Sequence, residues 1–206
     1  MKQNRPKVIV ITGGIGSGKS TAIDIIKEHG FTVLDSDKIV HEGYNIGSDL
    51  YLKIINHFSE EILNRDRTID RQKLGKIVFN HEKKLNELNE IVHKYVYDKL
   101  EEDSVKLSEA VVFHDIPLFL ETKDKYDPIY DEIWLVYVSE EIQRKRLKAR
   151  AIIENKNPED VLKIIDKQIP IEEKVFMVDE VINNEGNRNE LREKIKKLLE
   201  IKGIGW

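Results

Sequence analysis

The chain contains no cysteine among its 206 residues, which excludes disulfide bonds and thiolate catalysis. It also has no apolar run that approaches the roughly 18 residues needed by a membrane-spanning helix. Residues 1–7 are polar and precede only a short apolar stretch, so we expect no signal peptide there. These absences favour a cytoplasmic protein without a membrane partner.

An excess of positive charge is absent as well. Lys and Arg number 34 and Asp and Glu number 38, so the formal net charge is -4. That balance, together with the lack of aromatic residues interleaved with basic ones, argues against a nucleic-acid partner. A chain of this length suits one α/β domain, which we expect to be a monomer or a weak homo-oligomer.

Short β-branched segments that alternate with helical patterns predict a parallel sheet, because a strand–helix–strand order forms a right-handed crossover unit. The predicted strands are Val8–Thr12, Phe31–Leu34, Val111–Ile116, Ile133–Val138 and Glu180–Asn183. The predicted helices outside residues 38–107 are Lys19–His29, Glu140–Ile153, Val161–Ile169 and Asn189–Ile201. Gly30 is expected to end the first of these helices.

Residues 38–107 carry a helical pattern and no buried strand. Their apolar residues recur at spacings of three and four, at Leu85, Leu88, Ile91, Val92 and Val96. We therefore expect a single domain whose core comprises residues of about 7–39, 108–145 and 175–206. A helical insertion at about 40–105 and a charged lid at about 146–170 complete it.

The clearest motif is Gly13-Gly14-Ile15-Gly16-Ser17-Gly18-Lys19-Ser20, which matches G-x-x-x-x-G-K-[ST]. Glycines let consecutive backbone N–H groups converge on phosphate oxygens, and the helix that follows points its positive end at the same place. Lys19 is expected to contact the β- and γ-phosphates, and the Ser20 hydroxyl to coordinate Mg²⁺. An apolar strand before the motif and an amphipathic helix after it indicate a nucleotide site rather than an ordinary glycine-rich turn.

Other nucleotide-binding classes fit the chain poorly. A GTPase needs a base-reading Asn-Lys-x-Asp segment, and Asn155-Lys156-Asn157 is followed by Pro158 in a charged break. A motor ATPase normally ends a strand in a carboxylate pair, whereas residues 111–115 end in the single Asp115. A small kinase needs a phosphate cradle, a carboxylate near the acceptor, cations over the phosphoryl group and a lid.

Two carboxylates follow the second predicted strand. Asp35 and Asp37 lie two residues apart, so both can face a ligand at the carboxyl end of the sheet, one as base and one on Mg²⁺ through water. Both residues also suit the N-cap of a following helix. The spacing alone leaves these two interpretations open.

The cations expected over the phosphoryl group lie in the charged helix and the predicted lid. Arg146 and Arg150 are four residues apart on one helix face, where like charges repel unless phosphates neutralise them. A solvated helix face, balanced by nearby glutamates, is the alternative for this run of charge.

Taken together, these segments resemble the dephospho-CoA kinase family over nearly the whole chain. The similar segments are 11–21 around the phosphate motif, 33–37, 69–79, 88–93, 116–121, 138–150 and the closing residues Gln168 and 178–184. The resemblance implies transfer of the ATP γ-phosphate to the ribose 3′-hydroxyl of dephospho-CoA. It also implies a fold like that of nucleoside-monophosphate kinases, with a five-stranded parallel sheet flanked by helices, a substrate-binding insertion and a lid.

The resemblance also assigns roles to residues. ATP is expected at Gly14, Ile15, Gly16, Ser17, Gly18, Lys19, Ser20 and Thr21, with Mg²⁺ held through its phosphates and Ser20. Asp37 is expected to be the base, with Lys19, Arg146 and Arg150 as the catalytic cations. Dephospho-CoA is expected at Asp37, Arg71, His93 and Leu118.

Several points stay open in the sequence. Asp35 or Asp115 is expected to reach Mg²⁺ through water, and Asp115 and Glu121 suit a structural hydrogen bond equally well. Lys94 stands where the family usually has proline, and Ala151 where it often has aspartate. Another small-molecule or nucleoside kinase is the alternative function, followed by a regulatory module that hydrolyses ATP slowly.

Overall fold

The computed structural model describes residues 5–126 and 128–205. The chain folds as two compact units. The first unit comprises Met1–Leu34 and Ser104–Trp206, and the second comprises Asp35–Asp103. None of the described helices combines the length and the low charge that crossing a lipid bilayer requires.

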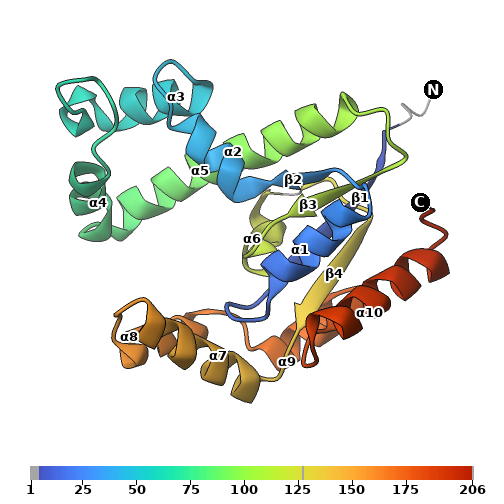
Figure 1. The fold of residues 1–206 in the computed structure, drawn as a ribbon. Coiled ribbons are helices and arrows are strands. Elements are labelled where there is room, and N and C mark those ends of the chain that lie inside the picture. Colours follow the sequence, from blue (N-terminus) through green and yellow to red (C-terminus); the bar gives the residue numbers. More distant parts are fainter. Residues whose placement is uncertain (1–4, 127, 206) are drawn as a thin grey trace. The chain divides into compact units, whose positions relative to one another are not determined.

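A five-stranded parallel sheet forms the centre of the first unit, with the strand order β2-β3-β1-β4-β5 (Figure 1). The strands are β1 Lys7–Gly13, β2 Val33–Asp35, β3 Val111–Asp115, β4 Glu132–Tyr137 and β5 Glu180–Asn183. Ile11 of β1 lies opposite Asp115 of β3 on one side and Trp134 of β4 on the other. Because the strands are parallel, the carboxyl ends of β1 and β3 lie at the same end of the sheet.

The first unit also contains helices outside the sheet, and α1 and α10 pack on it. These helices are α1 Lys19–Glu28, α6 Phe119–Tyr126, α7 Glu140–Ile153, α8 Pro158–Leu162, α9 Ile171–Lys174 and α10 Arg188–Ile201. Two short 3₁₀ turns, η2 Ile165–Lys167 and η3 Val175–Met177, lie between them. Side chains at i and i+2 of a strand share a face, so Ile9 and Ile11 meet α1 and α10 together. Each aliphatic side chain buried there contributes about 1.5–3 kcal/mol.

The second unit is helical. It contains α2 Ser36–Gly43, α3 Asp49–Phe58, the 3₁₀ turn η1 Glu60–Ile62, α4 Arg71–Phe79 and most of α5 Glu82–Val105. A core of its own includes Leu50, Tyr51, Ile54, Leu74 and Val78. The predicted apolar face of α5 packs on this core through Leu85, Leu88, Ile91 and Val92. Asp35 is the last residue of β2; between residues 36 and 103 only the isolated bridge of Leu63 and Ile69 has strand character, in agreement with the sequence prediction for residues 38–107.

All five predicted strands are confirmed, although β2 begins at Val33 rather than Phe31. The helix predicted over Val161–Ile169 is wrong. Asn157 accepts a hydrogen bond from the N–H of Glu159, and Pro158 occupies the first turn, so α8 begins earlier and ends at Leu162. Pro170 favours extended backbone at the residue before it, so helix does not continue past η2. Helix α6 was not predicted from the sequence.

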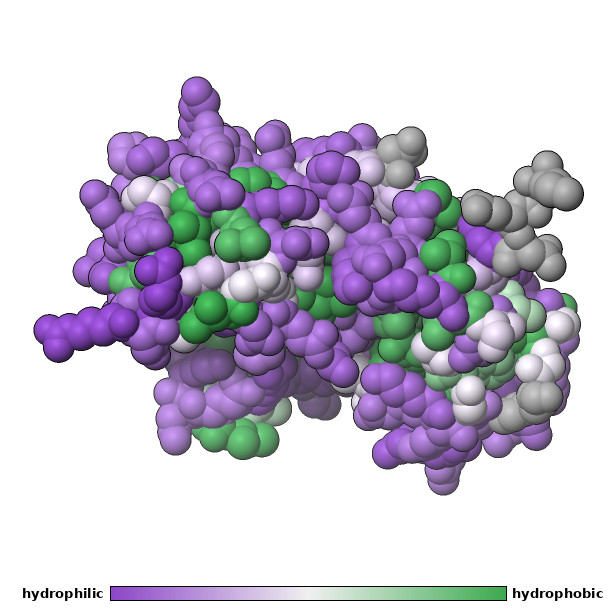
Figure 2. Space-filling view, turned by 90° about the horizontal axis from the view of Figure 1, so that it is seen from above, coloured by the Kyte–Doolittle hydropathy of each residue, from purple (hydrophilic) through white to green (hydrophobic). Residues whose placement is uncertain are grey.

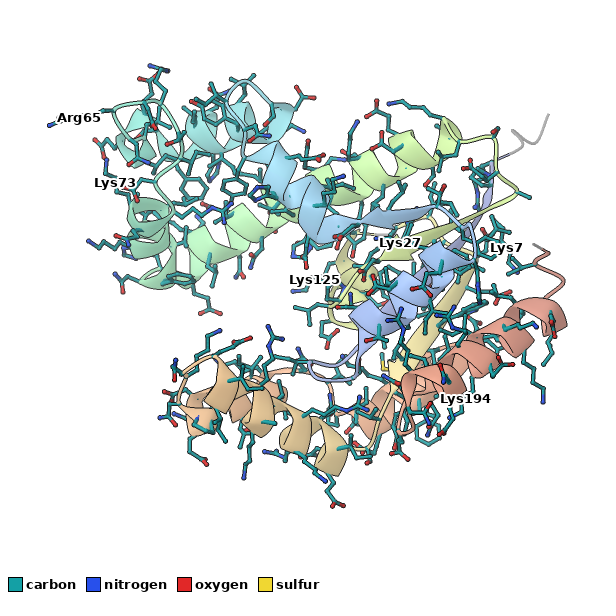
Figure 3. All side chains as sticks on the ribbon, in the orientation of Figure 1. Lys7, Lys27, Arg65, Lys73, Lys125 and Lys194 are labelled. Carbon is teal, nitrogen blue, oxygen red and sulfur yellow. The ribbon has the colours of Figure 1, made fainter. Side chains whose placement is uncertain are left out.

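Charged and polar side chains dominate the exposed surface, in keeping with a charged fraction of 35%. Figure 2 shows hydrophilic residues over most of one face, with hydrophobic residues in smaller patches between them. Ion pairs tie the elements together; for example, Lys7 of β1 lies 2.5 Å from Glu132 of β4. Lys194 of α10 donates to the carbonyl of Asn183 at 3.0 Å and so holds α10 to the end of β5 (Figure 3).

Candidate active site

The glycine-rich loop joins β1 to α1, as the motif predicts. Gly16 and Gly18 have φ values of 79° and 83°, in the left-handed region that favours glycine. Gly18 is also the N-cap of α1, and no side chain caps that helix. The N-terminus of α1 therefore presents its N–H groups and its partial positive charge to the loop, which is the arrangement that binds phosphate.

Lys19 and Asp115 form an ion pair at the carboxyl end of the sheet, where β1 and β3 end. Both side chains are largely buried, with 14% and 12% of their surface exposed. Nearby, the Thr12 hydroxyl donates to the carbonyl of Pro117 at 3.0 Å, which fixes the chain that leaves β3. The structure thus brings the predicted phosphate-binding lysine together with one of the predicted Mg²⁺ carboxylates.

The two predicted lid arginines have different surroundings. Arg146 is partly buried and donates to the carbonyl oxygens of Ser17 at 3.3 Å and Asn184 at 2.8 Å. Arg150 is exposed and pairs with Glu154 of the next turn at 2.5 Å. Arg150 also lines a cavity of about 480 Å³ beside the loop, together with Ile15, Leu147 and Ile164.

Three polar side chains form hydrogen bonds with the backbone of the glycine-rich loop, and the sequence analysis assigned no function to any of them. Asn184 is buried and donates to the carbonyl of Ser17 at 2.8 Å, and a Cβ on Gly18 would collide with its amide. Gln143 and Gln168 each bond to the backbone of Ile15. These residues lie far from the loop in the sequence, so no local motif connects them to it. In the sequence they stand out only as members of the segments that resemble the family.

Glu121 and Leu118 follow β3. Glu121 lies 2.6 Å from the ammonium of Lys174, which is completely buried. Of the two roles left open for Glu121, the structure therefore shows a structural ion pair. Leu118 lies just before α6, and 43% of its surface is exposed.

In the second unit, Asp35 and Asp37 occupy different positions at the start of α2. Asp35 is the N-cap of α2 and accepts a hydrogen bond from the N–H of Lys38 at 3.0 Å. The capping interpretation is thus confirmed for Asp35. Asp37 lies in the first turn of α2, and its side chain is exposed to solvent.

Arg71 is the first residue of α4, and its guanidinium lies over the ring of Tyr44 at 5.1 Å. Both residues line a cavity of about 330 Å³. Its wall is otherwise mostly apolar and includes Leu74, Leu88 and Phe79, of which 78% is exposed. The cavity combines a cation with a broad apolar surface.

His93 lies on α5, half-buried, with its ring stacked on that of Tyr97 at 6.4 Å. Lys94 pairs with Asp98 at 3.1 Å, and α5 continues without interruption through this position. A proline there would remove a helical hydrogen bond, so a residue with a backbone N–H, such as lysine, lets α5 continue through this position.

Comparisons with known proteins agree with this arrangement. The family model for CoaE, dephospho-CoA kinase, matches residues 7–190. A dephospho-CoA kinase of Carboxydothermus hydrogenoformans is 41% identical over 196 residues, covering 94% of this chain and 93% of the relative. One from Staphylococcus aureus strain Mu50 is 39% identical over 200 residues, covering 96% and 94%.

Solved structures are similar over the same length. TT1252 from Thermus thermophilus superimposes with a TM-score of 0.80 at 29% identity, covering 98% of this chain and 100% of that one. Dephospho-CoA kinase from Campylobacter jejuni gives 0.67 at 29% identity, covering 96% and 98%. Shikimate kinase from Bacteroides thetaiotaomicron, at 13% identity and 0.51, shares the fold. The chain therefore belongs to the dephospho-CoA kinase family, a family of ATP-dependent kinases.

Proposed function

We propose that the Gly13–Ser20 loop is the place where this dephospho-CoA kinase holds the phosphates of ATP. The reaction moves the γ-phosphate to the ribose 3′-hydroxyl of dephospho-CoA and leaves coenzyme A and ADP. One observation carries the assignment of the loop. Two glycines with positive φ turn the chain into the uncapped N-terminus of α1, directly before Lys19.

Lys19 supplies the charge that this transfer needs. Its ammonium balances the Asp115 carboxylate in a largely buried position, so both charges are held close to the loop. When ATP binds, the β- and γ-phosphate oxygens compete for the same ammonium. A preset cation that meets the charge developing on the phosphoryl group lowers the barrier because it needs no reorganisation.

The oxygen donors near Lys19 fit Mg²⁺. No group of three or more His, Asp and Glu side chains able to hold a metal occurs among residues 5–126 and 128–205. Mg²⁺ is usually bound by substrate phosphates with one or two protein oxygens, so the Ser20 hydroxyl and, through water, the Asp115 carboxylate suffice. Bound there, the ion would neutralise charge on the β- and γ-phosphates.

Asp37 is the residue we propose to accept the proton of the ribose 3′-hydroxyl. Asp35 already uses its carboxylate to cap α2, whereas the carboxylate of Asp37 is exposed in the first turn of the same helix. A general base has to reach the acceptor hydroxyl directly or through one water. Support comes from these contacts and from the family-like segment at residues 33–37.

Dephospho-CoA carries phosphates, an adenine ring and a flexible pantetheine arm that includes apolar methyl and methylene groups. The cavity of the second unit offers matching groups, with the Arg71 guanidinium for phosphate and the side chains of Tyr44 and Phe79 for flat or apolar groups. We propose this cavity as a substrate subsite. The roles of His93 and Leu118 in substrate binding stay predictions, as does the cytoplasmic location.

Arg146 and Arg150 are proposed to act on the nucleotide side. Arg146 holds the carbonyls of Ser17 and Asn184, so its guanidinium is fixed beside the loop. The Arg150 guanidinium pairs with Glu154 at the surface, and breaking such an exposed pair to contact a phosphate costs little free energy.

A comparison of acceptors tests the proposed function. Purified protein would be incubated with ATP, Mg²⁺ and either dephospho-CoA or other hydroxyl acceptors such as nucleosides and shikimate, and the products weighed by mass spectrometry. We expect the mass of one added phosphate on dephospho-CoA alone. Phosphorylation of another acceptor at a higher rate would support the alternative small-molecule kinase.

A further inference from the structure

Ile15, in the middle of the glycine-rich loop, is bonded on both sides of its backbone by glutamine side chains. The amide of Gln143 donates to the Ile15 carbonyl at 2.8 Å. The side-chain oxygen of Gln168 accepts from the Ile15 N–H at 3.1 Å. Because Ile15 offers one acceptor and one donor, the orientation of both glutamine amides is determined by chemistry.

Gln143 packs closely against the two glycines that flank Ile15. Gln143 lies in the first turn of α7 and is 2% exposed. A Cβ on Gly14 would collide with its amide, and one on Gly16 would lie 3.3 Å from its backbone carbonyl. The glycines on either side of Ile15 therefore allow α7 to approach, and they leave the Ile15 backbone few steric restraints of its own.

The same two glutamines flank residues 144–167, which include most of α7, α8 and η2. Arg144 and Asp166, just inside them, form an ion pair at 3.1 Å that closes the base of this segment. The segment therefore begins and ends on one residue of the loop. Its position and the conformation of the Ile15 backbone are tied together by these contacts.

We propose that Gln143 and Gln168 are positioning residues that hold the loop ready for ATP through the Ile15 backbone. Without them, the flexible glycine-flanked residue has to be ordered when ATP binds, and this ordering weakens binding. The proposal rests on the ATP-binding role of the loop, but it assigns no contact between either glutamine and the nucleotide.

Paired substitutions at the two positions give opposite expectations. Gln168→Glu keeps an oxygen that accepts from the Ile15 N–H, whereas Gln168→Met removes it. Gln143→Glu replaces a donor with an oxygen that faces the Ile15 carbonyl, so glutamate is no better than methionine there. Each glutamate adds the same negative charge beside the same loop residue, which makes the two positions controls for each other.

The first measurement is the Kd of ATP for each variant by calorimetry, without dephospho-CoA. We expect ATP to bind about three- to tenfold more weakly to Gln168→Met and to both Gln143 variants. We expect Gln168→Glu to bind ATP more tightly than Gln168→Met, and Gln143→Glu no more tightly than Gln143→Met. Equal affinities for Gln168→Glu and Gln168→Met would overturn the proposal.

Amide hydrogen exchange at Ile15 is the second readout and needs no nucleotide. The Ile15 N–H should exchange slowly in the unchanged protein and in Gln168→Glu, and faster in Gln168→Met. Equal exchange in all three would overturn the proposal. If the Gln143 variants do not fold, the more exposed Gln168 pair decides alone. If the unchanged protein binds ATP but leaves dephospho-CoA unphosphorylated, the proposed function fails while the glutamine contacts remain tested.

Discussion

Lys174, which is completely buried, holds its ammonium 2.6 Å from the carboxylate of Glu121. The pair joins α9, which follows η2, to α6, which follows β3. Removing one partner of such a pair leaves an uncompensated buried charge. We therefore predict that Lys174→Met lowers the free energy of unfolding by about 3–5 kcal/mol, measured by urea denaturation.

The exposed pair of Lys163 and Asp160 offers a matched control, with side chains 68% and 65% exposed. Lys163→Met should leave the free energy of unfolding nearly unchanged, because an exposed ion pair contributes little. Combining Lys174→Met with Glu121→Leu should restore much of the lost stability because no buried charge remains. Similar effects of Lys174→Met and Lys163→Met would contradict this account.

The ionisation of the Glu132 carboxyl makes the free energy of unfolding depend on pH. Burial alone would raise the pKa of its carboxyl, but hydrogen bonds from Lys7, Trp134 and Lys202 lower that pKa to about 2. Since the folded-state pKa lies below the ordinary value of about 4.5, the stabilisation is complete above pH 4.5 and is lost as the pH falls towards 2. The shift corresponds to about 3 kcal/mol, which solvent screening at the partly exposed lysines reduces to about 1–2 kcal/mol.

Glu132→Gln tests this acid dependence. The substitution should lower the free energy of unfolding by about 1–2 kcal/mol at pH 7 and much less at pH 2, where the carboxyl of the unchanged protein becomes protonated. Urea denaturation at both values gives the comparison. An equal loss at both pH values would show that the charge of Glu132 contributes nothing.

Lys19→Met should lower kcat at least about a hundredfold, because the transition state then loses its preset cation. Lys27 is the matched control, since it lies in the last turn of the same helix and is exposed (Figure 3). Lys27→Met should leave kcat within about twofold, as expected for a surface substitution. Steady-state ADP release measures both, and comparable rates for the two variants would disprove the role of Lys19.

Asp37→Asn should reduce kcat by about 10²–10⁴ while the Kd for ATP stays nearly unchanged, because only the proton acceptor is lost. Asp49→Asn is the control, since Asp49 is likewise exposed in the first turn of a helix of the second unit. Near-normal turnover by Asp37→Asn would mean that another group accepts the proton.

Arg71→Met should raise KM for dephospho-CoA about tenfold and leave KM for ATP unchanged, because Arg71 is the cation that the described residues lining the proposed cavity offer to a phosphate. Arg65→Met provides the control at an exposed position of the same unit (Figure 3). A rise in KM for ATP instead would place Arg71 on the nucleotide side.

The sequence predicts most of the secondary structure because its signals are local. The strand before Gly13, the glycines and Lys19 lie within one short segment, and their geometry follows from residue type. The α5 helix is readable from spacing alone, since Leu85, Leu88 and Ile91 share one face. The division of residues 158–167 into two short pieces was missed because Asn157 and Pro158 override the apolar pattern.

The support of the loop could not be predicted in the same way. Asn184 donates to Ser17 across 167 residues of sequence, and Gln143 to Ile15 across 128. No spacing rule connects residues so far apart, and a buried glutamine has no local signature. For Asp35, in contrast, the sequence indicated two roles, a ligand contact and a helix N-cap. The hydrogen bond that it accepts from the N–H of Lys38 shows the N-cap.

Coupling between ADP release and the acceptor shows most directly whether this chain phosphorylates dephospho-CoA. The rate of ADP release with ATP and Mg²⁺ would be followed as dephospho-CoA is added, alongside the amount of phosphorylated product. We predict almost no release without dephospho-CoA, a saturable rise with it, and one ADP for each coenzyme A formed. Release that is the same with and without dephospho-CoA would rule out the coupled transfer and indicate a slow ATP-hydrolysing module instead.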